Sequence, residues 1–347
     1  MKKVKVLVFS SNEDFARSVL EDIRNSGFEP YLAGRNDTRY LKYSKLPKDV
    51  IYFADSEMAN FSLDYLNRLI RFIVHNKIDI ILPISVPQVL FVSKFIDQFR
   101  NVVVEPLIAE FNAIEIVENK RLFTEFCRRH NINQPKTFLI NETPPKDIKF
   151  PLILKDFEKD TPDKREINNR LELNNLSISD NGVLQESITG VDLDCNVIAK
   201  KGKILSCLFQ RNYKPEHNLD GGPYCLQAVE PSAQAKMVVS KLIKDLNWSG
   251  LAHIDMRETK TGEIFVFELN PRIWVSYRFC YLFGLDIIKT LIEASMGKTE
   301  FNTPKLNDNL YLSPRGLLEL QNIKLTIKQL GKLKLYYQNV PGAQTDL

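Results

Sequence analysis

The sequence predicts an α/β protein whose second half is an α+β unit built on an antiparallel sheet. In the first hundred residues, short apolar strands alternate with amphipathic helices, which favours a small doubly wound sheet. From Val183 onward, short strands follow one another with hairpin turns between them. One of these strands ends in a carboxylate, an amide and a guanidinium, from Glu268, Asn270 and Arg272. These observations together indicate both the fold class and where its chemistry lies.

The first unit is expected to cover residues 1–110. Its strands are expected at residues 4–10, 29–33, 78–82 and 102–105. Residues 13–25 should form a helix that Asn12 could cap and that ends before Gly27. Apolar residues spaced three and four apart mark a second helix around residues 63–73. No glycine-rich turn follows the first strand, so a dinucleotide site is not expected.

A second, smaller unit is expected over residues 111–182. The pattern of residues 119–127 is helical, and residues 151–155 form a short apolar strand that ends in Lys155. Residues 156–181 are highly charged and nearly free of large apolar side chains. We therefore expect a mobile loop or a poorly buried helix there.

The third unit is expected over residues 183–300, followed by a C-terminal extension at residues 301–347. Its first strands are expected at residues 183–187, 192–199 and 203–210, the last two joined as a hairpin. An amphipathic helix should span residues 232–246. A mostly apolar helical region follows Arg272.

Composition narrows the class of protein. The chain has 347 residues, of which 44% are hydrophobic and 26% charged, as in soluble globular proteins. Its five cysteines are scattered without a CxxC pair, which suggests neither a disulfide framework nor a zinc site and favours a cytoplasmic location. The most apolar stretch, residues 78–96, is interrupted by two prolines and two charged residues, so no membrane partner is expected.

Residues 250–258 and 263–270 should form a hairpin around the glycine-containing turn at 259–262. Pairing across this turn brings Asp255 within about two residues of Glu268. An alternative is a solvated edge hairpin whose polar residues face water. Both strands are otherwise strongly apolar, which favours a functional cluster instead.

The side chains at the end of the second strand can hold a metal ion. Residues two apart on a strand face the same way, so Glu268 and Asn270 should point together with Asp255 nearby. Phe265, Phe267 and Leu269 should then point to the other face. Carboxylate and amide oxygens are suited to Mg²⁺, and Arg272 offers a phosphate fork.

This order of elements resembles the ATP-grasp superfamily, and most of all its carboxylate–amine ligase and carbamoyl-phosphate-synthase-like branch. The resemblance runs from the first strand to about Gly297, and its most specific part is Asp255 followed by Glu268-Leu269-Asn270-Pro271-Arg272. It implies an ATP-grasp fold in which residues 111–182 form a lid subdomain. It also implies ATP and Mg²⁺, with Mn²⁺ as an alternative metal, and activation of a carboxylate as an acyl phosphate that an amine then attacks.

The resemblance assigns the cluster specific roles. Asp255, Glu268 and Asn270 match the metal ligands of the family, and Arg272 matches the catalytic arginine that would hold the γ-phosphate or the acyl phosphate. A plain ion pair between Arg272 and Asp255 or Glu268 remains an alternative. Lys120 and Lys155 match the two basic positions that reach the phosphates.

The rest of the nucleotide site is also implied by resemblance. Residues that match the adenine hinge, which acts through its backbone, are Gln185, Glu186, Ser187 and Ile188, with Ile153 and Leu184 sandwiching the ring. Asp192 lies where the family has an acid for the ribose, although Asp194 and Glu186 are alternatives. An exposed hairpin with acidic side chains would explain the same residues.

Acceptor-substrate binding is assigned more loosely. Gly221 and Gly222 resemble a loop that follows the central hairpin in related ligases, and Arg211 could contact a substrate carboxylate. A bare surface turn fits these residues equally well. His253 shares a face with Asp255, and we interpret it as a core histidine rather than a residue that supports the metal site.

One departure from the family pattern matters. Family members carry a glycine-rich phosphate loop after the second lysine, whereas residues 156–165 contain no glycine. Lys159, Lys164 and Arg165 could substitute for it with side-chain charge. The alternative function is a non-catalytic protein that binds ATP or a metabolite.

The charge of the chain bears on whether a nucleic acid is a partner. The net charge of +4 is small, and no basic stripe interleaved with aromatic residues appears, so a nucleic-acid partner ranks last. The resemblance implies small-molecule carboxylate and amine substrates, and its members are often homodimers. The sequence does not identify the carboxylate, the amine or the pathway.

Overall fold

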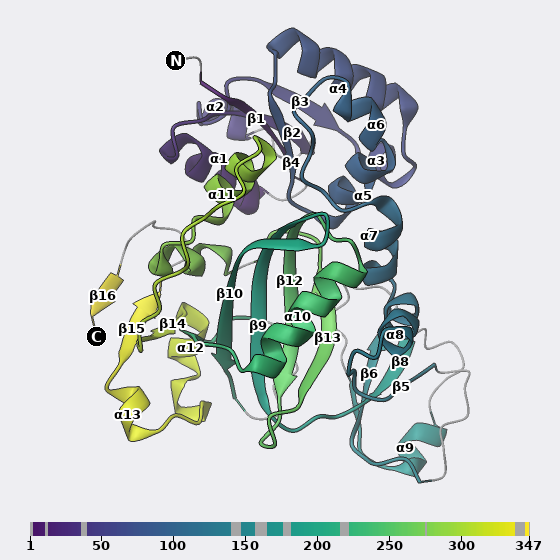
Figure 1. The fold of residues 1–347 in the computed structure, drawn as a ribbon, viewed down its shortest axis with the longest axis vertical. Coiled ribbons are helices and arrows are strands. Elements are labelled where there is room, and N and C mark those ends of the chain that lie inside the picture. Colours follow the sequence, from purple (N-terminus) through teal and green to yellow (C-terminus); the bar gives the residue numbers. More distant parts are fainter. Residues whose placement is uncertain are drawn as a thin grey trace.

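The computed structural model describes residues 3–10, 13–35, 40–139, 147–156, 165–175, 182–215, 222–274, 276–336 and 344–346. Within these ranges the strands form a four-stranded N-terminal sheet, a second four-stranded sheet and an eight-stranded sheet. The N-terminal sheet sits at one end of the eight-stranded sheet, and the smaller second sheet lies beside it (Figure 1).

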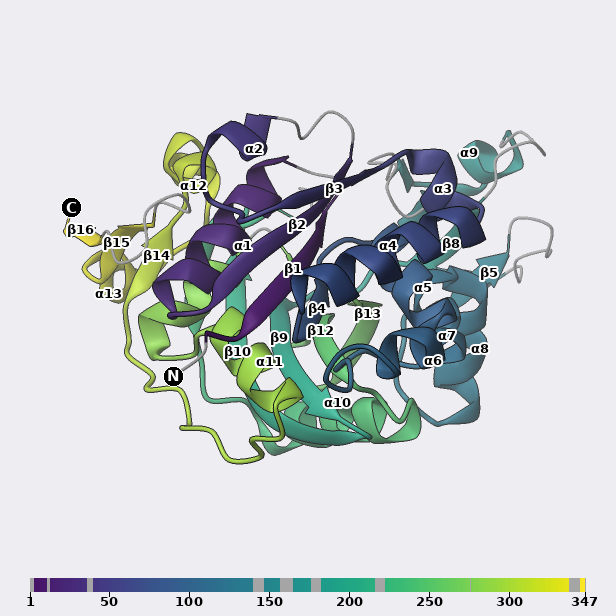
Figure 2. The ribbon, with the colours of Figure 1, turned by 90° about the horizontal axis from the view of Figure 1, so that it is seen from above.

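The N-terminal sheet is parallel, with strand order β3-β2-β1-β4. Its strands are β1 (Lys5–Ser10), β2 (Glu29–Arg35), β3 (Val50–Phe53) and β4 (Ile80–Pro83). On β1, Val6 and Val8 pack with α1 (Glu13–Asn25), whereas Leu7 and Phe9 pack with α4 (Leu63–Asn76). Helices therefore cover both faces (Figure 2), which confirms the predicted doubly wound sheet.

Two strands of this region differ from expectation. β3 has three half-buried residues out of four, a burial pattern too weak to be recognised from periodicity. Residues 102–105, in contrast, form no strand. The chain there passes beside β4, and the Val104 backbone N–H donates to the Asp79 carbonyl at 2.9 Å without a continuing ladder.

The second sheet is antiparallel, with strand order β5-β8-β6-β7. Its strands are β5 (Thr137–Leu139), β6 (Leu152–Asp156), β7 (Arg165–Ile167) and β8 (Gly182–Glu186). Its helices are α7 (Phe111–Glu118), α8 (Lys120–Arg129) and α9 (Arg170–Asn174). β7 and α9 occupy part of the charged stretch for which a mobile loop or a poorly buried helix was expected. α9, whose one buried residue is Leu173, fits the second alternative, whereas β7 is a strand because Ile167 reaches the same small core. Residues 157–164 and 176–181 of that stretch lie outside the described residues.

The eight-stranded sheet has the order β13-β12-β9-β10-β11-β14-β15-β16. Its strands are β9 (Val191–Lys200), β10 (Lys203–Tyr213), β11 (Cys225–Ala228), β12 (Gly250–Glu258), β13 (Ile264–Asn270), β14 (Leu310–Leu312), β15 (Leu333–Tyr336) and β16 (Gln344–Asp346). The expected hairpin of β9 and β10 and the hairpin of β12 and β13 are both present.

The two faces of this sheet have different chemistry. On β9, Leu193, Cys195 and Val197 face a core that includes α10 (Ala233–Asp245). The residues between them on the same strand, Asp194 and Asn196, therefore face the other way. That opposite face is polar in its centre, where the chain offers groups for a site.

The helices not yet named complete the fold. The shorter ones are α2 (Tyr40–Tyr43), α3 (Asp55–Ala59), α5 (Val86–Lys94), α6 (Ile96–Arg100), α12 (Pro314–Leu318), η2 (Leu320–Asn322) and α13 (Ile327–Leu330). After β13 come η1 (Tyr277–Phe283) and α11 (Ile287–Ser295), which share one core with α1 and the N-terminal sheet. These two helices form the apolar helical region that the sequence predicted after Arg272.

A buried ionic contact ties η1 to α1. The Asp22 carboxylate accepts hydrogen bonds from the Tyr277 hydroxyl at 2.6 Å, from the Arg278 guanidinium at 2.8 and 3.1 Å, and from the Tyr281 hydroxyl at 3.1 Å. Arg278 also donates to the Ser18 carbonyl at 2.7 Å. We call Asp22, Tyr277, Arg278 and Tyr281 the Asp22 anchor. It fixes the segment that follows β13 to the N-terminal sheet.

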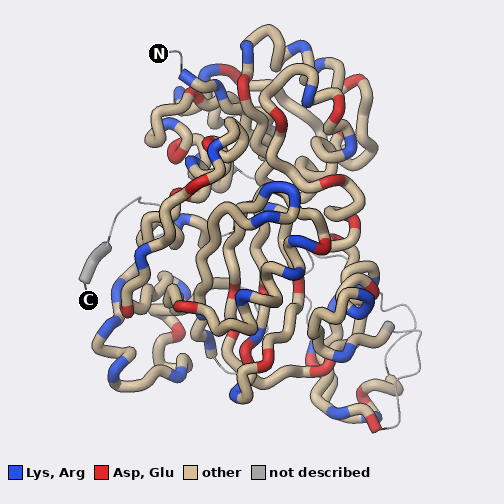
Figure 3. The backbone as a smooth tube through the Cα atoms, in the orientation of Figure 1, with Lys and Arg blue, Asp and Glu red and all other residues tan. Residues whose placement is uncertain are grey.

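None of the helices in the described part of the chain combines the length and the apolar character needed to cross a bilayer. In the part of the chain that the structure describes, acidic and basic residues are interspersed along the backbone (Figure 3).

Candidate functional site

The hairpin of β12 and β13 places the predicted metal ligands side by side. Asp255 lies directly opposite Glu268, and His253 lies directly opposite Asn270. This register agrees with the prediction that Asp255 lies within about two residues of Glu268. The three candidate ligands therefore converge at one end of two paired strands.

A β-bulge in β13 changes which side chains lie on the same face of the hairpin as Asp255 and Glu268. Asp255 pairs with Glu268 and Met256 with Val266, so Phe267 is an extra residue on β13. Val266 and Leu269 are buried against α10, whereas Phe267 lines a pocket together with Glu268. The expectation that Phe267 faces away from Glu268 is therefore wrong. By the same alternation Phe265 does not share the buried face of Leu269 either.

The three candidate ligands contact one another through an amide. Asn270 Nδ2 donates to Asp255 Oδ2 at 3.2 Å and to Glu268 Oε1 at 3.2 Å. The positive end of the amide dipole thus lies between two carboxylates. If this amide turned over, it would present Oδ1 instead, which would give three hard oxygen donors around one point. This donor set fits Mg²⁺ or Mn²⁺.

His253 supports Asp255 from the side. Its Nε2 lies 3.0 Å from Asp255 Oδ1, its Nδ1 lies 2.7 Å from Asn196 Oδ1, and its ring stacks on Trp274 with centroids 5.0 Å apart. Asn196 Nδ2 donates to Gln210 Oε1, so the Asn196 oxygen is left to accept from the imidazole. Burial would lower the pKa of His253, but Asp255 outweighs it and the net pKa is raised. His253 is partly buried, and it also holds a predicted ligand.

Asp194 adds a further carboxylate that the sequence indicated only as an alternative to Asp192. It lies opposite Asp255 on the neighbouring strand. Candidate ligand atoms of Asp194, His253 and Asp255 lie within 4.8 Å of one another. Burial, followed by repulsion from Asp255, raises the pKa of Asp194 to about 7. Burial also raises the pKa of Asp255, with Glu268 adding to the effect. The cluster therefore carries an excess of negative charge that a bound cation would offset.

A pocket next to this cluster brings the two predicted phosphate lysines together. Its lining includes Lys120, Phe123, Lys155, Gln185, Phe267 and Glu268. Lys120 is the first residue of α8, whose N-terminus is capped by the Asn119 side chain. The Lys155 ammonium lies 4.9 Å from the centroid of the Phe267 ring. Residues from α8, β6, β8 and β13 thus meet at one place.

The predicted hinge borders the same pocket. Gln185 pairs with Ile153, and Leu184 pairs with Leu154. Leu184 belongs to the small core with Leu152 and Leu154, so it cannot sandwich a ring together with Ile153, which faces the other way. That expectation is wrong because neighbouring residues of a strand alternate.

Two backbone groups of the hinge are already bonded within the protein. The Glu186 N–H donates to the Lys136 carbonyl at 2.9 Å, and the Ser187 N–H donates to the Pro151 carbonyl at 3.2 Å. The Ile188 carbonyl accepts from Arg257 Nη1 at 2.7 Å. The two N–H groups thus tie the hinge to residues that precede β5 and β6, and the Ile188 carbonyl ties it to β12.

Arg257 also holds Asp192. Its guanidinium contacts Asp192 Oδ1 at 2.5 and 2.8 Å, and Lys214 Nζ lies 2.5 Å from Asp192 Oδ2. Burial would raise the pKa of Asp192, but Lys214 and Arg257 outweigh it and lower that pKa. The guanidinium carbon lies 5.2 Å from the Phe267 centroid. Sequence reasoning missed Arg257, although its position two residues after Asp255 on one strand could have revealed it.

Arg211, which was predicted to contact a substrate, does not lie with the cluster around Asp255. It pairs with Leu193, whose side chain faces α10, and its Nη2 donates to Glu258 Oε2 at 2.6 Å. Arg211 therefore lies on the opposite face of the sheet from Asp255. Its neighbours Gln210 and Asn212 occupy the polar face instead, because side chains alternate along β10.

The remaining predicted residues are placed as follows. The Gly222 carbonyl accepts from Asn212 Nδ2 at 3.0 Å, and Gly221 lies outside the described residues. Arg272 is half-buried, and its Nη1 donates to the Ile273 carbonyl at 3.2 Å. Among the described residues it forms no ion pair with Asp255 or Glu268.

Comparison with known proteins shows which family has this arrangement of residues. Residues 117–276 match the family model of the ATP-grasp domain, and this range includes both lysines, the hinge and the β12–β13 hairpin. The chain carries an ATP-grasp domain. The predicted recognition of the ATP-grasp superfamily and its fold is thereby confirmed. A search of curated proteins finds no significant match.

Solved structures extend the likeness beyond the ATP-grasp domain itself. The chain is similar to L-amino acid ligase from Bacillus licheniformis, with a TM-score of 0.69 and 15% identity over 86% of this chain and 76% of that one. It is also similar to biotin carboxylase from Campylobacter jejuni, with a TM-score of 0.68 and 15% identity over 89% and 74% of the two chains. N5-carboxyaminoimidazole synthetase from Staphylococcus aureus gives 0.67 and 13% identity over 88% and 81%. At these identities the likeness establishes the fold.

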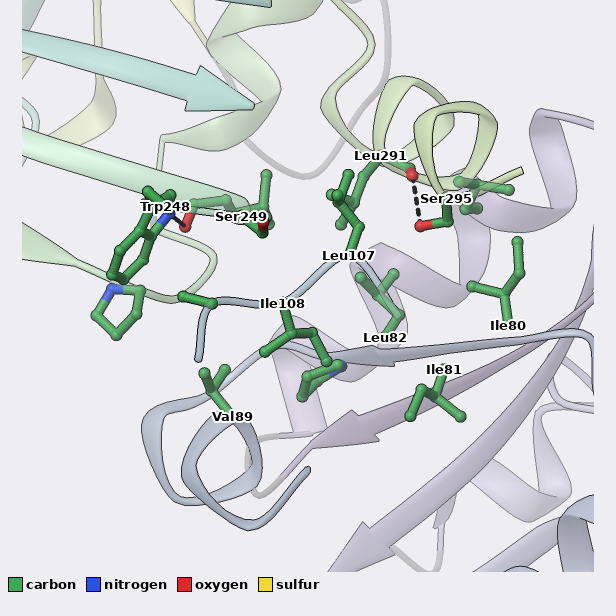
Figure 4. A pocket seen from close by; sticks show the side chains of 16 residues that line it. Ile80, Ile81, Leu82, Val89, Leu107, Ile108, Trp248, Ser249, Leu291 and Ser295 are labelled. Carbon is green, nitrogen blue, oxygen red and sulfur yellow. Dashed lines mark hydrogen bonds between the residues drawn. The ribbon is translucent and has the colours of Figure 1, made fainter. Parts of the chain in front are cut away.

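A second pocket lies between the ATP-grasp domain and the N-terminal sheet (Figure 4). Ile80, Leu82, Leu107 and Leu291 give it a mainly apolar lining. Its polar groups are bonded internally: Trp248 Nε1 donates to the Leu251 carbonyl at 3.0 Å and Ser295 Oγ to the Leu291 carbonyl at 2.9 Å. It lacks the charged groups that line the pocket beside Glu268.

Proposed function

We propose that this protein is an ATP- and Mg²⁺-dependent ligase that activates a carboxylate as an acyl phosphate and joins it to an amine. The observation that carries this proposal is the convergence of Asp255, Glu268 and Asn270 beside the pocket that Lys120 and Lys155 line. Oxygen ligands for a divalent cation and ammonium groups for phosphates are the parts that phosphoryl transfer requires. The similar solved structures include an L-amino acid ligase, which supports an amine acceptor.

The metal would be held by Asp255, Glu268 and Asn270. A bound Mg²⁺ supplies charge neutralisation on the phosphates during transfer. His253 and Asn270 keep the Asp255 carboxylate oriented through both of its oxygens. A biotin carboxylase domain from Hydrogenobacter thermophilus with the same fold was solved with MgADP, which supports this choice of metal and nucleotide.

The chain's own cations would position the triphosphate. Lys120 and Lys155 reach the pocket from α8 and β6 as point charges. Arg272, which is not paired with Asp255 or Glu268 in the described structure, would hold the γ-phosphate or the acyl phosphate by two hydrogen bonds. Catalysis would rest on orientation and electrostatic stabilisation, and it needs no covalent intermediate on the protein.

The nucleoside end would lie along the hinge. Glu186, Ser187 and Ile188 run past the pocket next to β12, and Asp192 lies just beyond them. Asp192 is held by Lys214 and Arg257, so a ribose hydroxyl would share an oriented carboxylate. Gly222, next to Asn212 on the polar face, would border the acceptor substrate.

A second candidate function is a nucleotide-binding protein without turnover. The observation that favours it is the absence of glycine from residues 156–165, where a phosphate loop would need close backbone approach. Residues 157–164 lie outside the described structure, so this candidate rests on sequence.

Release of ADP separates the two functions. The protein would be incubated with ATP, Mg²⁺ and a panel of carboxylates and amino acids, and ADP would be measured with and without each amine. We expect release that requires both substrates and falls by at least about a thousandfold in Glu268→Gln. Glu263→Gln, an exposed change on the same hairpin, is the matched control and should retain activity. Nucleotide binding without ADP release for any pair would favour the second candidate.

A further inference from the structure

Trp274 packs flat against a histidine whose ring is held on two sides. The rings of Trp274 and His253 are stacked, with their centroids 5.0 Å apart and an angle of 17° between their planes. His253 Nδ1 lies 2.7 Å from Asn196 Oδ1, and His253 Nε2 lies 3.0 Å from Asp255 Oδ1. Because both ring nitrogens have partners, the imidazole cannot turn without breaking a contact. It therefore offers Trp274 a fixed surface.

No hydrogen bond to the described part of the chain holds the indole in this place. Trp274 Nε1 is buried and has no hydrogen-bond partner among the described residues. The side chain is 4% exposed and belongs to the apolar core that η1 and α11 share with the N-terminal sheet. An unpaired buried N–H lowers stability, so the area and shape of the ring must hold Trp274 where it lies.

Arg272, which we propose as a phosphate ligand, lies two residues before Trp274. Its Nη1 donates to the carbonyl of Ile273, the residue between them, at 3.2 Å. Ile273 is 1% exposed, so the backbone of this short stretch is packed as well. The Asp22 anchor begins only at Tyr277 and acts on the far end of the segment. The stack of Trp274 is the restraint that lies nearer to Arg272.

We propose that Trp274 is a positioning residue for Arg272, because its stack on His253 sets where the guanidinium meets the terminal phosphate of the nucleotide. His253 contacts both Trp274 and Asp255, so one imidazole places the arginine segment relative to a proposed metal ligand. A guanidinium that forms two parallel hydrogen bonds tolerates little displacement. This inference rests on the proposed function and extends it to a residue outside the predicted site.

Calorimetric titration with a non-hydrolysable ATP analogue and with ADP, both with Mg²⁺, measures what the terminal phosphate contributes to affinity. We expect the native protein to bind the analogue at least about tenfold more tightly than ADP. Arg272→Met and Trp274→Leu should each reduce this ratio to below about threefold. The double variant should lower it no further than Arg272→Met alone, because both changes remove one interaction.

Trp274→Phe separates stacking from hydrogen bonding. Phenylalanine keeps an aromatic ring on His253 and removes the unpaired N–H, so the ratio should stay within about twofold of the native value. A loss in Trp274→Phe as large as in Trp274→Leu would assign the role to the indole N–H as a ligand contact. That result would overturn the positioning role of the stack.

Tyr65→Leu is a matched control. Tyr65 on α4 is 0% exposed, packs against two aromatic rings, and carries a buried hydroxyl without a partner among the described residues. The change removes a large buried ring from the N-terminal unit and should leave the ratio of the two affinities intact, although it lowers stability. A similar loss of the ratio in this variant would attribute the effect of Trp274→Leu to general destabilisation and overturn the inference.

The remaining outcomes separate this inference from the proposed function. A preference for the analogue that survives in Trp274→Leu would overturn the role of Trp274 and leave the proposed function standing. Equal binding of the analogue and ADP by the native protein would contradict the role of Arg272 and this inference with it. If the native protein bound neither nucleotide, the proposed function would fail as well.

Discussion

Two polar clusters, one buried and one half-buried, flank the same stretch of chain, and their charges are arranged differently. In the Asp22 anchor, the carboxylate of Asp22 receives hydrogen bonds from one guanidinium and two hydroxyl groups. Around the end of β12 and β13, one imidazole lies against Asp255, and neutral amides donate hydrogen bonds to Asp194, Asp255 and Glu268. The anchor sets a guanidinium against its carboxylate, whereas in the second cluster Asp194 and Asp255 lie opposite each other and share one imidazole, so their charges are unbalanced.

This difference distinguishes a structural network from a proposed binding site. A buried charge with a full set of partners stabilises the arrangement that holds it, and removing one partner is costly. A buried cluster with excess charge destabilises the ligand-free protein and gains stability when a counter-ion binds. The hydrogen bonds of the Asp22 anchor thus hold in place the segment after β13, which includes Arg272.

The largest expected effect is on the anchor. Asp22→Asn removes the 2.8 Å carboxylate contact of the buried Arg278 guanidinium, which keeps a longer contact of 3.5 Å to Glu21, and we expect a loss of about 3–5 kcal/mol in the free energy of unfolding. Urea denaturation measures it. Asp97→Asn, in an exposed pair with Arg100, is the control and should change stability by less than about 0.5 kcal/mol. Equal effects in the two variants would remove the distinction between the clusters.

A smaller loss is expected at Asp192, which Arg257 and Lys214 hold beside the proposed nucleotide site. Asp192→Asn should lose about 2 kcal/mol at pH 7, because its charged hydrogen bonds to these two residues weaken. The pKa of Asp192 is lowered below its ordinary value of 3.8, so its contribution is complete above that pH and is lost as the pH falls through the lowered pKa. Urea unfolding at pH 7 and pH 5 should give the same difference between variant and native protein. A difference already absent at pH 5 would contradict this assignment.

The smallest expected effect has the opposite sign. Asp194→Asn removes one carboxylate from the unbalanced cluster and keeps its shape. We expect a gain of about 1 kcal/mol in the free energy of unfolding at pH 8 without divalent cations. Denaturant unfolding with a chelator present is the measurement. Destabilisation of similar size would mean that the cluster is balanced like the anchor.

Much of this contrast could be read from the sequence. The apolar strand before Glu268-Leu269-Asn270-Pro271-Arg272, with the turn before it, predicted the hairpin and the meeting of Asp255 with Glu268. Local periodicity was sufficient because both strands are adjacent in the chain. Lys120 and Lys155 also line one pocket as expected, although their roles remain proposals.

Other features depend on contacts that no local pattern encodes. The bulge at Phe267 contains no glycine or proline that would have predicted it. It turns Phe267, which was expected to face away from Glu268, toward the pocket. Arg211 was assigned by its position near a turn, yet alternation along β10 directs it to the other face. The Asp22 anchor joins residues about 255 positions apart, so only the packing of η1 on α1 reveals it.

Calorimetric titration of ATP with and without Mg²⁺ tests the central claim most directly, in the native protein and in Asp255→Asn/Glu268→Gln. Removing these carboxylate charges should leave the protein folded, since they lie in the unbalanced cluster. We predict that Mg²⁺ tightens ATP binding by at least about tenfold in the native protein and has no effect on the double variant. The same tightening by Mg²⁺ in both proteins would contradict the account.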